Sequence, residues 1–514
     1  MSVISYVELL KLVAPETIVV LTVLAVLAAD LLALRGLELR FRLLISAMIA
    51  CAGCAVAIAW MLALPPQATF PEGMSSAPPF IIHNSSFILP LVVDPLTQFI
   101  KIALLLLTIF TVLISVDTDF TPHVGEYFGL ILLAAVGMML LVSSEDTLMI
   151  FISLELTSLS LYILTAFNKR NPKSAEAALK YFLFGGLSAA FTLFGLSLLY
   201  GLSGSTNLAQ IAAAITGPKL DPLLVGALVM TVVGLGFKVA AVPFHLWAPD
   251  AYQGAPTPTA AFIASGSKVA GFFVLARVML HGFKGAEGSG AWLDYRPGWV
   301  PLLALMAGAS MLLGNLTAIV QSSVRRLLAY SAIAHAGYML LGVLPHGQQG
   351  LAALVYYAIT YGLATLGAFG VVSIVEAQTG GDRLSDFAGL SRRAPVLSFC
   401  MMIFMLSLAG IPPLAGFFGK FYLFASALNA APSDLGLLWL VVVALALSAV
   451  SLYYYLQVLK QIYIAEPGQG TTAAPKSIIS RVVIALLALA VVALGCAPDL
   501  LMGRLVGAIQ AAGF

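Results

Sequence analysis

Charged side chains are scarce in this sequence. Asp, Glu, Lys and Arg together make up 9% of its 514 residues, against about a quarter in a typical soluble protein. Apolar side chains make up 61%, and the mean hydropathy is +1.02. No soluble domain could hide so much apolar surface, so we expect a single all-α polytopic membrane domain over residues 1–514 with the lipid bilayer as its surroundings. The net charge of +2, without a basic or acidic tail, gives no indication of nucleic acid binding.

Cysteine is equally scarce, with four residues in the chain. Cys51 and Cys54 form a C-x-x-C motif, but it lies inside the apolar run ISAMIACAGCAVAIAW with no histidine nearby. Packing is therefore the preferred interpretation, and no metal or redox site is expected here. The N-terminus also lacks the basic region and cleavage site of a signal peptide, so we expect the first span to be retained.

Apolar runs long enough to cross a bilayer recur fourteen times. Their approximate centres are residues 25, 52, 106, 135, 156, 189, 235, 268, 309, 335, 363, 411, 448 and 488. The longest interruption, residues 64–89, contains four prolines and predicts an extended loop. With these spans, fourteen Lys and Arg fall on one side and five on the other. The positive-inside rule then predicts both termini on the periplasmic side of a bacterial inner membrane.

Six basic residues fall inside the expected spans. They are Lys101, Lys180, Lys238, Lys268, Arg277 and Lys420. Lys101 and Arg277 lie near span ends, where snorkelling to the outer surface is the preferred interpretation, and Lys180 could reach the cytoplasm in the same way. The others are too deep for this. Lys238 lies nine residues before Trp247 and Lys268 lies eleven after Thr257, which places both about 14 to 17 Å from one surface, near the midplane.

One acidic residue, Glu155, is comparably deep. With Lys238, Lys268 and Lys420 it would cost roughly 10 to 14 kcal/mol if all four were charged and unpaired, which is comparable to the stability of a whole domain. These groups must therefore be paired, hydrated or neutral, and contact between Glu155 and a lysine would offset much of the cost. A buried lysine that titrates when a neighbouring charge moves suits a proton relay. A lysine that only tethers helices is the alternative for any single position.

Helix breakers mark two of the deep lysines. Gly236 and Pro243 flank Lys238, and the run LAGIPPLAGFFG precedes Lys420. Spans of this kind, five apart, predict two inverted five-helix repeats, each containing a broken helix. We expect four parts: helices 1–3 in residues 1–125, the first repeat in 126–283, the second in 297–465 and helix 14 in 476–514.

The motifs now in hand are FHLWAPDAYQGAPTPTAAF, SKVAGF, RRLLAYSAIAHAGYMLLG and LAGIPPLAGFFGKFYLF. From about Tyr127 to Tyr455 the chain resembles the N subunits of proton-translocating NADH–quinone oxidoreductase, respiratory complex I. The wider group includes L and M subunits, Mrp antiporters and membrane-bound hydrogenase subunits. Ser267-Lys268-Val269 stands where those other subunits usually carry a histidine-led segment, which favours the N type.

The resemblance implies roles for several residues. Glu155 and Lys238 match the family's glutamate–lysine pair, Lys268 its central lysine and Lys420 the lysine that opens toward the periplasm. Supporting positions are Lys180 on the input side and His245 between the central lysines, and weaker ones are Tyr330 and His335. The turn APDAYQ between spans seven and eight then faces the cytoplasm.

The resemblance also implies the assembly. Other membrane subunits of complex I are the expected partners and protons the transported species. FMN, iron–sulfur clusters and quinone are expected in other subunits, with no cofactor or metal in this one. The expected function is proton pumping coupled to quinone reduction elsewhere in the complex, a translocase subunit without redox chemistry. The alternative is a cation/proton antiporter subunit of Mrp or hydrogenase type.

Overall fold

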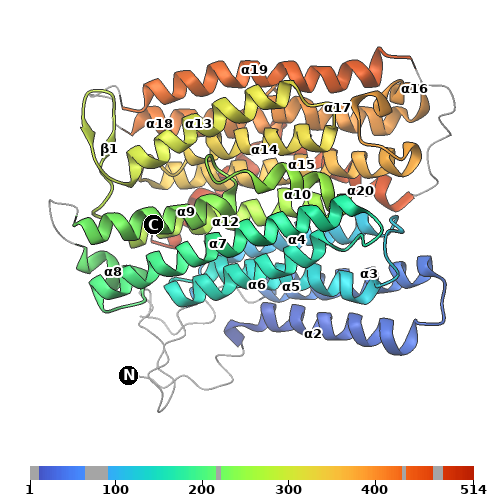
Figure 1. The fold of residues 1–514 in the computed structure, drawn as a ribbon, viewed down its shortest axis with the longest axis horizontal. Coiled ribbons are helices and arrows are strands. Elements are labelled where there is room, and N and C mark those ends of the chain that lie inside the picture. Colours follow the sequence, from blue (N-terminus) through green and yellow to red (C-terminus); the bar gives the residue numbers. More distant parts are fainter. Residues whose placement is uncertain (1–10, 64–90, 216–220, 431–435, 467–477, 514) are drawn as a thin grey trace.

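The structure is a computed structural model, and it describes residues 11–63, 91–215, 221–430, 436–466 and 478–513. The loop expected at 64–89 lies outside these residues. Helices dominate the described chain, and Figure 1 shows most of them side by side with roughly parallel axes, α2 and α3 at one edge and α19 at the other. The two short strands β1 (Ser289–Gly290) and β2 (Tyr295–Arg296) form an antiparallel hairpin before α13.

The helices before this hairpin include all those that the sequence assigns to the first eight spans. Their bounds are α2 (Ala14–Ala28), η1 (Ala29–Ala33), α3 (Leu39–Ala63), α4 (Pro95–Ser115), α5 (Val124–Ser143), α6 (Thr147–Thr165), α7 (Pro172–Ser203), α8 (Leu208–Ala214), α9 (Pro222–Val239), α10 (Trp247–Gly254), α11 (Thr257–Ala264), α12 (Gly266–Arg277) and η3 (Val278–Gly282).

The helices after it cover the remaining spans. Their bounds are α13 (Trp299–Ile319), α14 (Val324–Leu340), α15 (Gln348–Thr379), η4 (Leu384–Phe387), α16 (Leu390–Arg393), α17 (Pro395–Ala409), α18 (Ala415–Asn429), α19 (Leu438–Tyr463), α20 (Ile478–Cys496) and α21 (Asp499–Ala511). The short helix α21, which packs on α4 and α15, was not expected.

The all-helical membrane fold is confirmed. Within the described residues, twelve helices are long and apolar enough to cross a membrane. The other two expected positions, near residues 335 and 411, are also helical. The first is the 17-residue helix α14, and the second is divided between α17 and α18.

Span eight differs from the uninterrupted helix that the apolar run predicted. Its backbone breaks at Ser265, where φ is −109° and ψ is −80°, so α11 and α12 are separate helices. An 18-residue apolar window within Thr257–Gly282 is nevertheless completely buried, and the corresponding window of α15 is 89% buried. These two spans therefore form the centre of the protein, whereas α2 and α3 are buried over only a third of their apolar windows and expose apolar side chains at the protein surface.

Candidate proton-transfer site

Two helix breaks of matching geometry organise the site. The first break lies between α9 and α10, and the second between α17 and α18. Each preceding helix ends in a left-handed residue, Ala240 with φ 54° and Gly410 with φ 89°. A cis peptide bond to proline, at Pro243 and at Pro413, follows three residues later in both. The sequence predicted that both spans are broken, and the structure adds that their backbones turn in the same way.

In each break a lysine ammonium binds the backbone carbonyl at the equivalent position. Lys268 Nζ donates to Val239 O at 2.6 Å, and Lys420 Nζ donates to Ala409 O at 3.0 Å. Both carbonyls belong to the residue four positions before the cis proline. In a continuous helix, the residue four positions after a carbonyl donates its backbone N–H to that carbonyl. Here that residue is the proline, which has no N–H. The lysines therefore replace a missing backbone donor at the negatively polarised end of a helix.

Lys268 and Lys420 are also held by a second partner each. Lys268 Nζ lies 3.2 Å from the carbonyl of Ala332 in α14, and Lys420 Nζ lies 2.8 Å from the hydroxyl of Ser448 in α19. The Lys420 ammonium also lies 4.9 Å from the centre of the Tyr338 ring, a cation–π distance. Both side chains are almost fully buried, at 2% and 4% exposed. Such placement makes them suitable for accepting and releasing protons in the interior.

Lys238 is also buried, in the first of the two broken units. Its Nζ donates to Ser158 Oγ in α6 at 3.2 Å, and its stem lies against α12, where a Cβ added to Gly271 would come within 3.3 Å of its Cγ. Glu155 lies three residues before Ser158 on α6 and interacts electrostatically with Lys238. Both residues are described, and no ion pair within 4 Å joins them, so the direct contact expected from the sequence is replaced by a longer-range one.

His335 is buried within electrostatic range of both carbonyl-bound lysines. Its Nδ1 lies 2.6 Å from Tyr357 OH and its Nε2 lies 2.9 Å from Tyr455 OH. The ring interacts electrostatically with both Lys420 and Lys268. The two hydroxyls hold the imidazole in place, and a hydroxyl can either donate or accept a hydrogen bond. His335 is therefore much better placed for proton transfer than its position in the sequence suggested.

Lys180 lies in a different environment from the deep lysines. Its side chain is 41% exposed and pairs with Glu176 at 2.7 Å and with Asp250 at 2.9 Å. Arg326 binds the other oxygen of Asp250 at 2.7 Å. Burial raises the pKa of Asp250, but the hydrogen bonds and charges of Lys180 and Arg326 outweigh burial and hold that pKa below its ordinary value. The Lys180 ammonium therefore belongs to a cluster of ion pairs at the turn around α10.

The remaining candidates are separated from one another. His245 is 6% exposed and lies in the first break beside the carbonyl of Pro243, and its Nδ1 makes no hydrogen bond of normal geometry to a described residue. Tyr330 is half-buried, with its ring 6.0 Å from the guanidinium of Arg326. In the part of the chain that the structure describes, no three His, Cys, Asp or Glu side chains gather closely enough to hold a metal ion.

Snorkelling of Lys101 and Arg277 was the wrong expectation. Lys101 is 4% exposed and forms an ion pair with Glu16 at 2.7 Å. Arg277 is fully buried, donates to Val142 O at 2.9 Å and lies 3.8 Å from the Asp94 carboxylate. Partners from other helices satisfy these charges inside the protein, and span position alone could not reveal them. Of the serines that bind lysines, only Ser158 had a sequence signal, its i,i+3 spacing from Glu155.

Comparison with known proteins now adds relatives. Residues 144–449 match the family described as "NADH:quinone oxidoreductase/Mrp antiporter, TM". The chain is 50% identical over 511 residues to NADH-quinone oxidoreductase subunit N 2 of Acidobacterium capsulatum, covering 98% of this chain and 99% of that one. It is 36% identical to subunit N of Nitrosomonas europaea, covering 96% and 97% of the two chains.

Solved structures show the same fold. A chain of respiratory complex I from Thermus thermophilus with bound aureothin matches with a TM-score of 0.75 and 36% identity, over 95% of this chain and 98% of that one. A chain of the Mrp complex from Dietzia sp. DQ12-45-1b matches with a TM-score of 0.77, over 98% and 99%, but at 21% identity. The second likeness shows a shared fold alone and gives no support to an antiporter function.

Proposed function

The chain belongs to the NADH:quinone oxidoreductase/Mrp antiporter family as an N subunit of NADH–quinone oxidoreductase, a multi-pass proton-translocating membrane subunit of complex I, and we propose that Glu155, Lys238, Lys268 and Lys420 form its proton path. The observation that carries this proposal is the binding of Lys268 and Lys420 to equivalent carbonyls of two matching breaks. Midplane ammonium groups held only by neutral partners can lose a proton without leaving an unpaired acid behind.

In the proposed cycle the charge on Lys238 controls Lys268. When Glu155 and Lys238 interact strongly, the positive field of Lys238 at Lys268 is weak. When the two separate, that field is stronger and favours release of the proton from Lys268. The proton then passes by His335 to Lys420 and leaves toward the periplasm. His335 supports this route between the lysines, since its ring interacts with both of them and is held by two hydroxyls. Lys180 and His245 are proposed to supply the input side, and Tyr330 has a minor role.

We also propose the division into two inverted repeats, residues 126–283 and 297–465, flanked by 1–125 and 476–514. Supporting this division, α7 and α15 are both 32 residues long and both end at a left-handed glycine, Gly204 with φ 69° and Gly380 with φ 73°. The packing partners also correspond. The pairs α5–α6, α7–α9 and α7–α10 have counterparts in α13–α14, α15–α17 and α15–α18.

The surroundings of the subunit are proposed from its family and its charge distribution. Neighbouring membrane subunits of complex I are its partners, and FMN, iron–sulfur clusters and quinone are held by other subunits, with no cofactor in this one. The asymmetry of Lys and Arg supports a bacterial inner membrane location with both termini on the periplasmic side.

The test replaces Glu155 and Lys238 with alanine, one at a time, in the whole complex. Each variant should lower NADH-driven proton pumping in proteoliposomes by at least about tenfold, because a tenfold change needs only about 1.4 kcal/mol at the rate-limiting transfer. Quinone reduction by the coupled enzyme should fall with it. Lys101→Ala is the control, since it removes a buried lysine that interacts with a glutamate, here through a direct ion pair, in the N-terminal helices outside the proposed path. Wild-type pumping by assembled Glu155→Ala and Lys238→Ala complexes would refute the proposal.

A further inference from the structure

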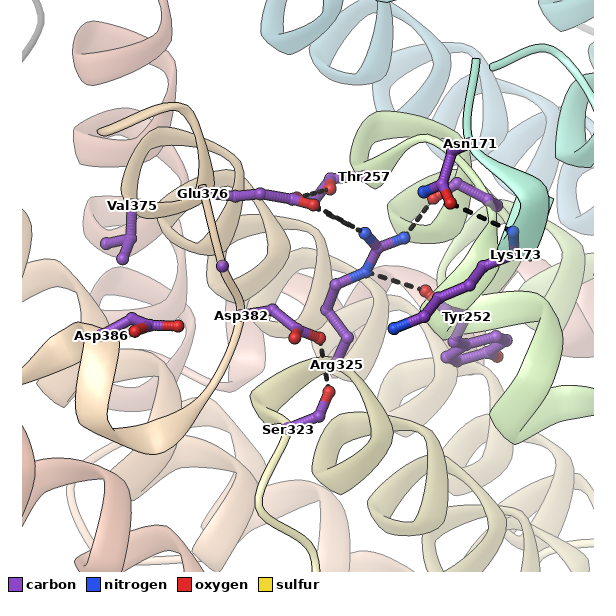
Figure 2. Close-up of polar contacts among 12 residues, drawn as sticks. Asn171, Lys173, Tyr252, Thr257, Ser323, Arg325, Val375, Glu376, Asp382 and Asp386 are labelled. Atoms are coloured by element: carbon purple, nitrogen blue, oxygen red, sulfur yellow. Dashed lines mark hydrogen bonds and ion pairs between the residues drawn. The ribbon is translucent and has the colours of Figure 1, made fainter. Parts of the chain in front are cut away.

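A buried arginine closes one end of the central helices. Arg325, at the start of α14, is 4% exposed. Its guanidinium donates to Tyr252 O at 3.0 Å, to Ala255 O and to both oxygens of Glu376 at 3.2 and 3.4 Å. Glu376 also accepts from the hydroxyl of Thr257. Figure 2 shows the guanidinium pointing from α14 into the turn between α10 and α11, with Glu376 of α15 on one side of it.

Three hydroxyls lead from this arginine toward the lysine row. Tyr252, Tyr361 and Thr365 are 0%, 3% and 1% exposed. The Tyr361 and Thr365 hydroxyls interact with each other, but none of the three makes a hydrogen bond of normal geometry to a described residue. Tyr252 is close enough to Tyr361 to interact electrostatically, and the Tyr361 ring lies 4.9 Å from that of His335. Buried polar groups almost always have partners, and ordered water supplies them where protein does not. These hydroxyls therefore offer partners for water along the helices between Arg325 and His335.

The arginine lies at one end of this set of hydroxyls. It precedes Ala332, whose carbonyl binds Lys268, by seven residues of α14, a distance of about 10 Å along the helix axis. The helices α10, α11, α14 and α15 pack on one another around it. A proton that moved between these helices from the level of Lys268 and His335 toward the start of α14 would approach the guanidinium.

We propose that Arg325 is an electrostatic barrier. It stops protons from leaking along α14 and α15 between the buried lysines Lys268 and Lys420 and the protein surface at the turn between α10 and α11. The inference rests on the proposed proton path. An arginine side chain stays protonated at all physiological pH values, and a fixed positive charge repels protons most strongly where water cannot screen it. Glu376 offsets only part of this field, because its side chain is 36% exposed and better screened by solvent than that of Arg325, which is 5% exposed.

A purely structural role makes a different prediction. The guanidinium also binds the last carbonyls of α10, as a cation at a helix C-terminus often does. For that role, any side chain at position 325 that makes the same hydrogen bonds would keep the protein impermeable to protons. For a barrier, the positive charge itself is required, and neutral donors fail.

Passive proton leak separates the two roles. The whole complex is reconstituted in liposomes without NADH, a potassium–valinomycin potential is applied, and proton entry is followed with an internal pH dye. Arg325→Gln should raise the leak by about tenfold or more, which corresponds to about 1.4 kcal/mol of barrier. Arg325→Lys, which keeps the charge, should remain tight. Arg326→Gln is the matched control, because its neighbouring guanidinium also binds α10, through Asp250 and Gln253, but is half-exposed.

Two results would overturn the barrier. The first is a leak in Arg325→Gln no greater than in the wild type or in Arg326→Gln. The second is a leak in Arg325→Lys equal to that in Arg325→Gln. Should Arg325→Gln not assemble, the double variant R325Q/E376Q removes both members of the pair and leaves no unpaired acid, and the same leak is expected.

One triple and one double variant test the route. Adding Tyr361→Phe and Thr365→Val to Arg325→Gln should suppress the leak, and an unchanged leak contradicts the hydroxyl path. Adding Lys268→Met to Arg325→Gln should also suppress it. If the leak persists only in this last variant, the barrier stands and the part of Lys268 in the proposed proton path fails.

Discussion

The two helix breaks have the same backbone conformation, but the lysines that bind their carbonyls come from different helices. In the first break the lysine that binds Val239 O comes from α12, in the following span. In the second break the lysine that binds Ala409 O comes from α18, the other half of the same broken helix. Proline removes the same backbone donor in each, so both breaks need a substitute. The need follows from the backbone, whereas the helix that meets it differs.

This difference separates a connecting lysine from a local one. Lys268 holds Val239 of α9 and Ala332 of α14 together, so its charge state affects two parts of the molecule that are far apart in sequence. The partners of Lys420 are Ala409 and Ser448, both in the second broken unit and its neighbour α19. Proton transfer at Lys268 can therefore alter the packing between the two units, and transfer at Lys420 acts within one of them.

Replacing either lysine should give the largest effect. Lys268→Met and Lys420→Met should each reduce NADH-driven pumping by at least about tenfold, since each removes a proton carrier. Lys268→Met should also lower the thermal stability more. It removes the link between α9 and α14 and leaves Val239 O without a donor, at a cost of about 1–3 kcal/mol, whereas Ala332 O keeps the backbone N–H of its own helix. Pumping is measured in proteoliposomes and stability by thermal unfolding of the purified complex.

An arginine in the same position distinguishes charge from titration. Lys268→Arg and Lys420→Arg keep a positive donor, but a guanidinium does not give up its proton in proteins. Assembly should therefore survive and pumping should not. If Lys268→Arg pumps like the wild type, Lys268 only tethers helices, and the difference between the two lysines concerns structure and not proton transfer.

The serines that hold two of the lysines should give a smaller effect. Ser158→Ala removes the acceptor for Lys238, and Ser448→Ala removes that for Lys420. Hydrogen bonds to charged groups contribute about 1.5–3 kcal/mol, so each variant should lower pumping several-fold. The loss should be greater for Ser448→Ala, whose bond is 2.8 Å long against 3.2 Å.

Ser160 provides the control for the serine variants. It is buried on the same helix as Ser158, but its hydroxyl donates to the carbonyl of Leu156 within that helix. Ser160→Ala should therefore leave pumping close to that of the wild type. Equal losses in Ser158→Ala and Ser160→Ala would mean that the helix, and not the bond to the lysine, is what matters.

Much of this arrangement was predictable from local sequence. Apolar runs identify the spans because a bilayer needs about 20 apolar residues for each crossing. Lys238, Lys268 and Lys420 stand out because charge is rare in such runs, and Pro243 and Pro413 mark the breaks because proline removes a helix bond. Each of these signals lies within one window of the sequence, so no knowledge of packing was needed.

The partners of these residues could not be predicted in the same way. The carbonyl that Lys268 binds is 29 residues away in α9, and the carboxylate that Arg325 binds is 51 residues away in α15. Such contacts depend on how the helices pack, and helical periodicity gives the face of a residue but not its neighbour. Span eight shows the same limit, since the break at Ser265 has no proline to announce it.

The smallest expected effects come from the left-handed residues that end α9 and α17, and they test the geometry of the breaks directly. An L-residue other than glycine costs about 1 kcal/mol or more in this conformation. Ala240→Gly should therefore stabilise the protein slightly and Gly410→Ala should destabilise it. Gly410→Ala has a further cost, because its new Cβ would lie 3.0 Å from Cδ and 3.4 Å from Nζ of Lys420.

Gly204 separates the two costs of Gly410→Ala. It is also left-handed, with φ 69°, but has no atom within 4 Å of an added Cβ, so Gly204→Ala measures the backbone cost alone. Gly410→Ala should lower the thermal midpoint further than Gly204→Ala and should reduce pumping as well, because it displaces the ammonium from Ala409 O. Identical stability and pumping in the two variants would show that Lys420 has room to move, and the bond at the second break would then be an incidental contact.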